Sequence, residues 1–282
     1  MKQKIIETIF SSKSSLFFSP WIRLLISLGL LNVWEGVYPS WEKAPEDDNV
    51  YEGEMWVKKQ TDRAQKALAD YRSSETISLA SLTKDYILSV ASGMLLPSIE
   101  NDLCIIDFGG GIGVSYLPLI ASIPHPEKVE FHIVEGETIC KRGQKILKEF
   151  SKLHFHTQLP KLIKPVDIVH AGSSIQYVKD WKVLLTKFSN YKPRLLVLED
   201  LMAGDIPSFI TTQNYYGKKI RSWFFNINEL IEEIEPLGYA LIYKSRYTHE
   251  ILGTVAPLSM KNFPSKYRLN YGTHLIFKRI EF

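Results

Sequence analysis

The chain has 282 residues, which suits one large domain with an extension or two smaller domains. Its hydrophobic content of 45% is that of an ordinary globular protein. A formal net charge of +3, with no Lys/Arg run longer than two residues, argues against a nucleic-acid partner. Two cysteines cannot form a disulfide framework, so we expect a reducing compartment and a cytoplasmic protein.

Residues 1–34 form an apolar segment with two interpretations. Pro20 and Arg23 interrupt the apolar run, which falls short of the about 20 clean residues that a membrane-spanning helix needs. A signal-peptide cleavage site is also missing. We expect a helix over about residues 21–31 that packs on the domain. The alternative is a helix that lies on the inner surface of the membrane and makes the protein peripheral to it.

Residues 35–100 are expected to form a helical lid or cap region. The segment 34–49 is aromatic, acidic and proline-bearing, and we expect an ordered loop there. Capping residues then predict one helix over about 61–71 and a longer one from Ser74 or Thr76 to about residue 95.

The most informative segment comes next. The apolar residues 103–106 end in Asp107, residues 107–113 read Asp-Phe-Gly-Gly-Gly-Ile-Gly, and a helix-compatible stretch follows over 114–122. This order predicts a buried parallel strand, a tight turn and a helix. Glycines let the backbone take positive φ and let a ligand lie against bare main chain, whose N–H groups favour an anionic group. Asp107 adds a negative charge beside that position.

The backbone N–H groups of the glycine turn suit a carboxylate, and Asp107 suits a cationic group. S-adenosylmethionine (SAM) is a ligand that carries both. The dinucleotide fingerprint fails because its sixth place holds Val114 or Tyr116 instead of glycine. The spacing Asp-x-Gly-x-Gly-x-Gly is typical of Rossmann-like methyltransferases. Another nucleotide and a purely structural turn remain as alternatives. The predicted cofactor-binding residues here are Asp107, Gly109, Gly110, Gly111 and Gly113.

The next strand and helix are predicted over 129–135 and 137–150. Glu135 ends that strand, 28 residues after Asp107. An acidic residue at this place accepts hydrogen bonds from ribose hydroxyls in doubly wound folds, so we add Glu135 to the cofactor site. A strand-ending glutamate without a ligand is the alternative.

A short third strand near 153–157 carries His154 and His156 on one face. The sequence offers them no third partner, and the seven histidines show no grouping with the cysteines that would indicate a metal site. We therefore predict no metal.

The fourth and fifth strands, predicted over 166–171 and 194–200, end near the same pocket because ligands sit at the carboxyl ends of parallel strands. Ser173 is expected to contact the methionine end of the cofactor or to help cap the following helix. His170 and Asp200 are the candidates for a general base. The alternative for His170 is a hydrogen bond to a backbone carbonyl that shapes the loop.

A loop is expected after the fifth strand, and Asn226 then has the spacing of a capping box and begins a helix to about residue 234. Two last strands, over 237–243 and 274–280, are joined by a loop and should be antiparallel. Five parallel strands followed by an antiparallel one predict an α/β fold with the sheet of Rossmann-like class I methyltransferases. The SAM-binding domain would span residues 101–282.

Residues 35–247 resemble a family of bacterial SAM-dependent methyltransferases encoded within surface-polysaccharide gene clusters. The matching segments are residues 36–44 (Gly-Val-Tyr-Pro-Ser-Trp-Glu-Lys-Ala), 107–116, 134–135 (Val-Glu) and 173–177 (Ser-Ser-Ile-Gln-Tyr). The resemblance implies a class I fold and a role in modifying a cell-surface glycan or its precursor. The chain departs from the family at Gly136, where the family has glutamine, so recognition of the ribose or adenine is less well defined.

We therefore expect a SAM-dependent methyltransferase that acts on an oxygen of a sugar or sugar-phosphate precursor. Tyr38, Trp41, Tyr215 and Tyr216 are candidates for a lid or for sugar-stacking walls, with buried packing as the alternative. Two other classes stay open: a non-catalytic SAM-binding scaffold of a glycan-assembly complex, and a nucleotide-dependent oxidoreductase. The sequence does not determine the acceptor, the methylated atom or the oligomeric state.

Overall fold

The computed structural model describes residues 32–73, 86–215, 218–247, 250–251, 254–255, 257–258 and 260–280. The helix expected over 21–31 lies outside the described residues, as does the expected helix start at Ser74 or Thr76. Within the described ranges, no helix combines the length and the apolar character needed to cross a membrane.

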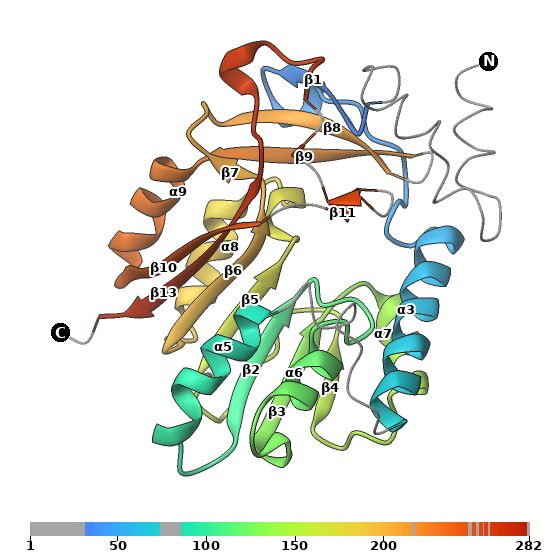
Figure 1. The fold of residues 1–282 in the computed structure, drawn as a ribbon, viewed down its shortest axis with the longest axis vertical. Coiled ribbons are helices and arrows are strands. Elements are labelled where there is room, and N and C mark those ends of the chain that lie inside the picture. The colour runs from blue at the N-terminus through green and yellow to red at the C-terminus, as the bar shows by residue number, and fades with distance from the viewer. Residues whose placement is uncertain are drawn as a thin grey trace.

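A seven-stranded sheet forms the centre of the molecule, in the order β10-β13-β6-β5-β2-β3-β4 (Figure 1). Strands β2 to β6 pair in parallel, and β13 is antiparallel to both β6 and β10. This arrangement confirms the predicted class I sheet. The strands are β2 (Leu103–Phe108), β3 (Val129–Val134), β4 (Leu153–His156), β5 (Ile168–Gly172), β6 (Leu195–Leu201), β10 (Tyr239–Tyr247) and β13 (Gly272–Arg279).

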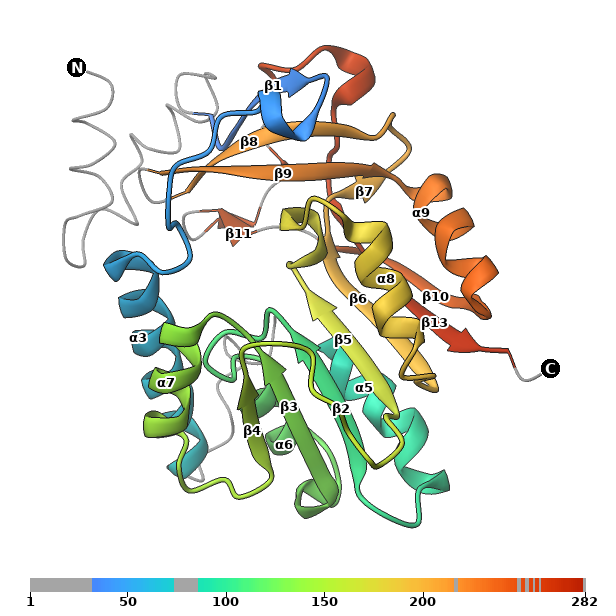
Figure 2. The same cartoon turned by 180° about the vertical axis from the view of Figure 1, so that it is seen from behind.

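Helices cover both faces of this sheet and enclose two apolar cores (Figures 1 and 2). The first face carries α3 (Glu54–Arg72), α5 (Tyr86–Leu95), α6 (Tyr116–Ser122) and α7 (Glu137–Ile146). The second face carries α8 (Trp181–Ser189) and α9 (Ile227–Ile234). The predicted cap of α9 is confirmed, because the side chain of Asn226 accepts hydrogen bonds from the N–H groups of Asn228 and Glu229.

The connection from β4 to β5, residues 157–167, contains no helix although every one of its residues is described. It crosses the α8 side of the sheet as a loop (Figure 2). The α8 face of β3 and β4 is therefore covered by a loop rather than by an apolar helix, and polar side chains can occupy it.

A second sheet, in the order β1-β8-β9-β7, corrects two expectations. The segment that starts at Trp34 is not a loop throughout, and the stretch between the fifth strand and Asn226 is not a loop either. The expected helical cap therefore begins with strand β1 and the short 3-10 helix η2. The elements are β1 (Trp34–Tyr38), η2 (Trp41–Lys43), β7 (Ala203–Gly204), β8 (Phe209–Tyr215) and β9 (Lys218–Asn226).

Long-range pairing explains this sheet. Strand β1 pairs antiparallel with β8, and its Trp34 is only 2% exposed because it packs edge to face on Phe224 at 5.7 Å between ring centroids. Strands β8 and β9 form a hairpin rich in threonine, isoleucine and aromatic residues, which favour strands. That composition could have been recognised in the sequence, whereas the pairing with β1 could not.

Candidate functional site

The glycine loop between β2 and α6 has the tight turn that the sequence predicts. Gly109, Gly111 and Gly113 have φ values of +75°, +57° and +67°, in the left-handed region that favours glycine. A Cβ added at any of them would lie within 3 Å of another residue. These contacts are 2.5 Å to Ser174 Cβ, 2.8 Å to Gln60 Oε1 and 2.7 Å to Leu147 Cδ1, respectively. Backbone conformation and lack of space thus both require glycine.

Glu135, the first residue after β3, reaches this loop. Its carboxylate accepts hydrogen bonds from the Gly111 N–H at 3.1 Å and from the Gly136 N–H at 2.9 Å. Burial raises the pKa of Glu135, and the two backbone hydrogen bonds oppose that rise. The structure therefore brings together the acidic residue and the glycine loop, as the sequence predicts.

Asp107 and His170 belong to a buried charged triad that also contains Glu199. The parallel register of β2 and β5 places Asp107 beside His170, and His170 Nδ1 lies 2.7 Å from Asp107 Oδ1. The other ring nitrogen, Nε2, lies 3.0 Å from Glu199 Oε2. All three side chains are at most 4% exposed. Both nitrogens of the imidazole are therefore engaged by carboxylates.

This geometry does not suit His170 as a general base. Burial by itself would lower the pKa of His170, but the charges and hydrogen bonds of Asp107 and Glu199 outweigh burial and raise the pKa to about 10. A base needs a free lone pair within reach of its substrate, and a buried imidazolium offers none. The alternative, in which His170 makes a hydrogen bond to a backbone carbonyl, does not hold either, because both ring nitrogens lie next to carboxylates. Glu199 was missed, although a carboxylate inside the apolar run 195–201 was a signal of a buried partner.

Ser173 and Asp200 lie close to each other at the ends of β5 and β6. The Gln176 side-chain N–H groups contact both, at 3.2 Å from Ser173 Oγ and 3.3 Å from the Asp200 carbonyl oxygen. Both residues have a φ of +50°, which is uncommon outside glycine. Strained backbone of this kind concentrates at functional sites. The Tyr177 hydroxyl donates to Gln213 Oε1 at 2.7 Å, and burial together with the charge of Asp200 raises the pKa of Tyr177.

Four aromatic side chains from separate segments meet above the strand ends. Tyr51 lies 6.1 Å from Trp56 and 6.0 Å from Tyr177 between ring centroids, and Trp56 lies 5.5 Å from Tyr215. Burial, with smaller effects from Tyr177, Tyr215, Glu46 and Glu135, raises the pKa of Tyr51 well above its usual range. Of these four residues, the sequence indicated only Tyr215 as a wall candidate and missed Tyr51, Trp56 and Tyr177.

The other aromatic candidates lie elsewhere. Trp41 is buried and stacks on Trp223 at 6.0 Å, in a small core that Tyr38 also contacts. Tyr38 and Trp41 therefore pack against the rest of the protein, which is the alternative that the sequence left open for them. Tyr216 lies outside the described residues.

Three polar atoms face three consecutive glycines of the loop. A Cβ added at Gly109 would lie 3.3 Å from Ser174 Oγ, and a Cβ added at Gly110 would lie 2.2 Å from Asp107 Oδ2. Gln60 Oε1 faces Gly111 in the same way. These three oxygens are buried and accept or donate no hydrogen bond within the described part of the protein. Buried polar atoms usually have a partner. Two of the three can only accept, so the arrangement fits a ligand that presents hydrogen-bond donors, such as an ammonium group.

Similarity to known proteins is found among solved structures. No family profile matches the sequence, and no curated protein is significantly similar to it. Among solved structures, magnesium protoporphyrin IX methyltransferase from Synechocystis PCC 6803, with bound S-adenosylhomocysteine (SAH), has 13% identity and a TM-score of 0.49 over 83% of this chain and 100% of its own. The CcbJ methyltransferase from Streptomyces caelestis has 11% identity and a TM-score of 0.45 over 68% and 90%. These scores are low, and the fold assignment rests on the strand order.

Proposed function

We propose that this protein is a SAM-dependent methyltransferase that methylates an oxygen of a sugar or sugar-phosphate precursor of a cell-surface glycan. The assignment of SAM as the cofactor is supported by the glycine loop at the carboxyl edge of a class I sheet, with Asp107 and Glu135 on either side of the loop. The acceptor class is supported by the sequence resemblance and by the aromatic wall of Tyr51, Trp56 and Tyr215, because flat apolar rings suit the faces of sugars.

The residues of the loop fit the polar groups of SAM. The oxygens of Gln60 and Asp107 that face the glycines would accept hydrogen bonds from the methionine ammonium group. Glu135 would accept hydrogen bonds from the ribose hydroxyls in place of its backbone N–H donors. SAM supplies a methyl group on a sulfonium, which a nucleophile attacks in line, so positioning is the main task of the protein.

His170 is a positioning residue in this proposal, because its cation holds the Asp107 carboxylate in one orientation through Oδ1. The role of general base passes to Asp200. This role is supported by the place of Asp200 at the end of β6 and by its charge, which together with burial raises the pKa of Tyr177, a residue in contact with Tyr51 of the aromatic wall. An alcohol loses its proton reluctantly, so a carboxylate beside the acceptor hydroxyl would assist transfer.

Ligand-induced stabilisation tests the cofactor. We expect SAH to raise the melting temperature, because a ligand at 100 times its dissociation constant adds about 2.7 kcal/mol to the free energy of unfolding. NADH at the same concentration should leave the melting temperature unchanged. A shift with NADH and none with SAH would contradict the proposal and favour an oxidoreductase. Mass spectrometry of glycan precursors, with and without the protein, would then separate an enzyme from a scaffold by the gain of one methyl group.

Glu135→Ala tests the ribose contact. We expect SAH affinity to fall by about 10- to 150-fold, since a hydrogen bond to a charged group contributes about 1.5–3 kcal/mol. Titration calorimetry measures this loss. Glu137→Ala is the matched control, because Glu137 is an exposed neighbour that pairs with Lys141 on the surface. Equal SAH affinity of Glu135→Ala and the parent would remove Glu135 from the site.

We also propose a cytoplasmic location. Cys104 and Cys140, the two cysteines of the chain, are both free and buried, which is typical of proteins from reducing compartments. Residues 1–34 are the segment that would contact the inner membrane if the protein is peripheral to it. Flotation of the intact chain with liposomes tests that contact.

A further inference from the structure

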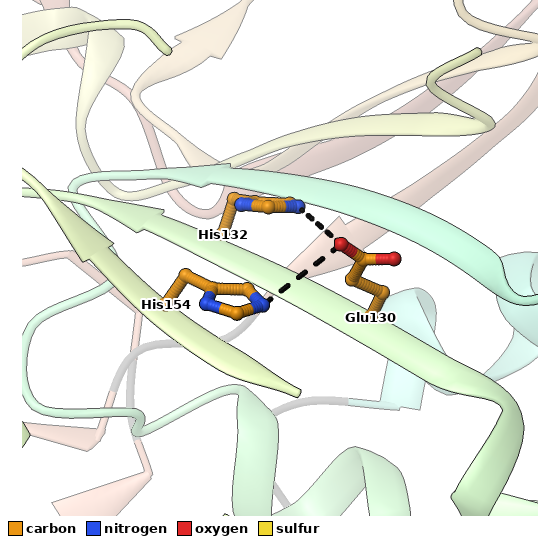
Figure 3. A group of neighbouring side chains, drawn as sticks. All are labelled: Glu130, His132 and His154. Atoms are coloured by element: carbon orange, nitrogen blue, oxygen red, sulfur yellow. Dashed lines mark ion pairs between the residues drawn. The ribbon is translucent and has the colours of Figure 1, made fainter. Parts of the chain in front are cut away.

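Three side chains of types that can ligate a metal lie together on β3 and β4 (Figure 3). Glu130 and His132 project from β3, and the parallel register pairs His132 directly with His154 on β4. The sequence pattern showed His154 and His156 without a further partner. His132 is that partner, and only the strand register brings it there.

The spacing of the ligand atoms fits a metal ion. Glu130 Oε1 lies 3.4 Å from His132 Nε2 and 3.9 Å from His154 Nε2. One ligand atom from each of the three residues lies within 4.8 Å of the others. Tetrahedral zinc with bonds of about 2.0–2.1 Å holds its ligands roughly 3.3–3.5 Å apart. Side-chain rotations that draw the ligand atoms from their spacing of up to 4.8 Å toward this separation would complete the geometry. Figure 3 shows both imidazole rings directed at the same carboxylate oxygen.

His132 provides a second observation. It is 4% exposed, and its Nε2 makes no hydrogen bond to the described residues although it is directed at Glu130. Its Nδ1 lies 3.0 Å from His156 Nε2. In the tautomer of His132 that donates from Nδ1 to His156, the Nε2 lone pair points toward the Glu130 carboxylate, and a cation placed between these two acceptors would bind both. A hydrogen bond from the other ring nitrogen is the usual support of a metal-binding histidine.

The surroundings fit an accessible cation site. Lys164, from the loop between β4 and β5, lies 2.7 Å from Glu130 Oε2 and leaves Oε1 to face the imidazoles. The His154 side chain is 40% exposed, which leaves a path for an ion and a position for water.

We propose that Glu130, His132 and His154 bind one Zn²⁺ ion, with water as the fourth ligand. Two imidazoles and one carboxylate are a donor set that zinc uses in proteins. The ion would tie the edge strand β4 to β3, next to the point where the Glu135 N–H donates to the His156 carbonyl at 2.9 Å. The site is independent of the proposed methyl transfer, because its ligands come from the middle of the strands rather than from their carboxyl ends.

Metal titration of the untagged, EDTA-treated full chain tests this proposal. We expect one equivalent of Zn²⁺ to bind in calorimetry, and one equivalent of Co²⁺ to give the visible absorption of a four-coordinate ion. Glu130→Gln and His154→Asn should each weaken binding by at least about 10- to 100-fold. His125→Asn is the matched control and should bind as the parent does, because His125 is an exposed histidine beside another glutamate, Glu127.

Two results would overturn the site: no Zn²⁺ binding by the parent, or binding that survives in both Glu130→Gln and His154→Asn. An equal loss in His125→Asn would do the same, because it would show unspecific binding. Melting by circular dichroism without metal controls for folding. Since Glu130 and His154 are partly exposed, we expect the metal-free variants to melt as the parent does.

Discussion

His170→Gln is expected to lower the free energy of unfolding by about 3–5 kcal/mol, the range found when one partner of a buried ion pair is removed. The variant would leave Asp107 and Glu199 buried without the cation that lies 2.7 and 3.0 Å from them. Urea denaturation at pH 7 measures the change. His125→Gln, at a side chain that is 69% exposed, is the control and should stay within about 0.5 kcal/mol of the parent.

The pH dependence of this difference identifies the charge on His170. The pKa in the folded state, about 10, lies above the ordinary value of 6.5, so the cation contributes fully below pH 6.5 and its contribution is lost as the pH rises through 10. The gap in unfolding free energy between the parent and His170→Gln should therefore narrow between pH 7 and pH 10. A gap below about 1 kcal/mol at pH 7, or one that stays constant to pH 10, would show that His170 is not the cation of a buried triad.

Gly111→Val is expected to weaken SAH binding by at least about 100-fold. The backbone φ of +57° is unfavourable for a β-branched residue, and the new Cβ would lie 2.8 Å from Gln60 Oε1. Strain of this kind amounts to about 1–3 kcal/mol, and its relief would move the loop away from Glu135 and Gln60. Titration calorimetry with SAH measures the loss, and circular dichroism confirms that the variant is folded.

Gly93→Val is the matched control for this substitution. Gly93 lies within helix α5, and among the described residues nothing beyond its chain neighbours and its own helix backbone lies within 4 Å of an added Cβ. Glycine is among the weakest helix formers, so we expect unchanged SAH affinity and no loss of stability. If a folded Gly111→Val variant bound SAH as tightly as Gly93→Val does, the glycine loop would not be the cofactor site.

The sequence by itself determined the central sheet and the glycine turn. Strands buried on both faces are continuous apolar runs, such as residues 103–106, and they can be recognised without knowing their neighbours. The turn after Asp107 and the cap at Asn226 depend on local backbone chemistry, which short motifs express directly. The sequence placed Glu135 in the cofactor site through its position at the end of the second strand of a doubly wound fold, and the structure added its contact with the Gly111 N–H.

The tertiary structure alone decided which distant residues meet. Strand β1 pairs with β8, whose residues follow it by most of the chain length, so local periodicity could not place either in a common sheet. Registers between parallel strands set His170 beside Asp107 and His132 beside His154. A strand pattern states which face a side chain occupies, but not which residue lies next to it on the neighbouring strand. The charge of His170 and the grouping of Glu130 with two histidines both depend on that neighbour, and for this reason only the folded chain reveals them.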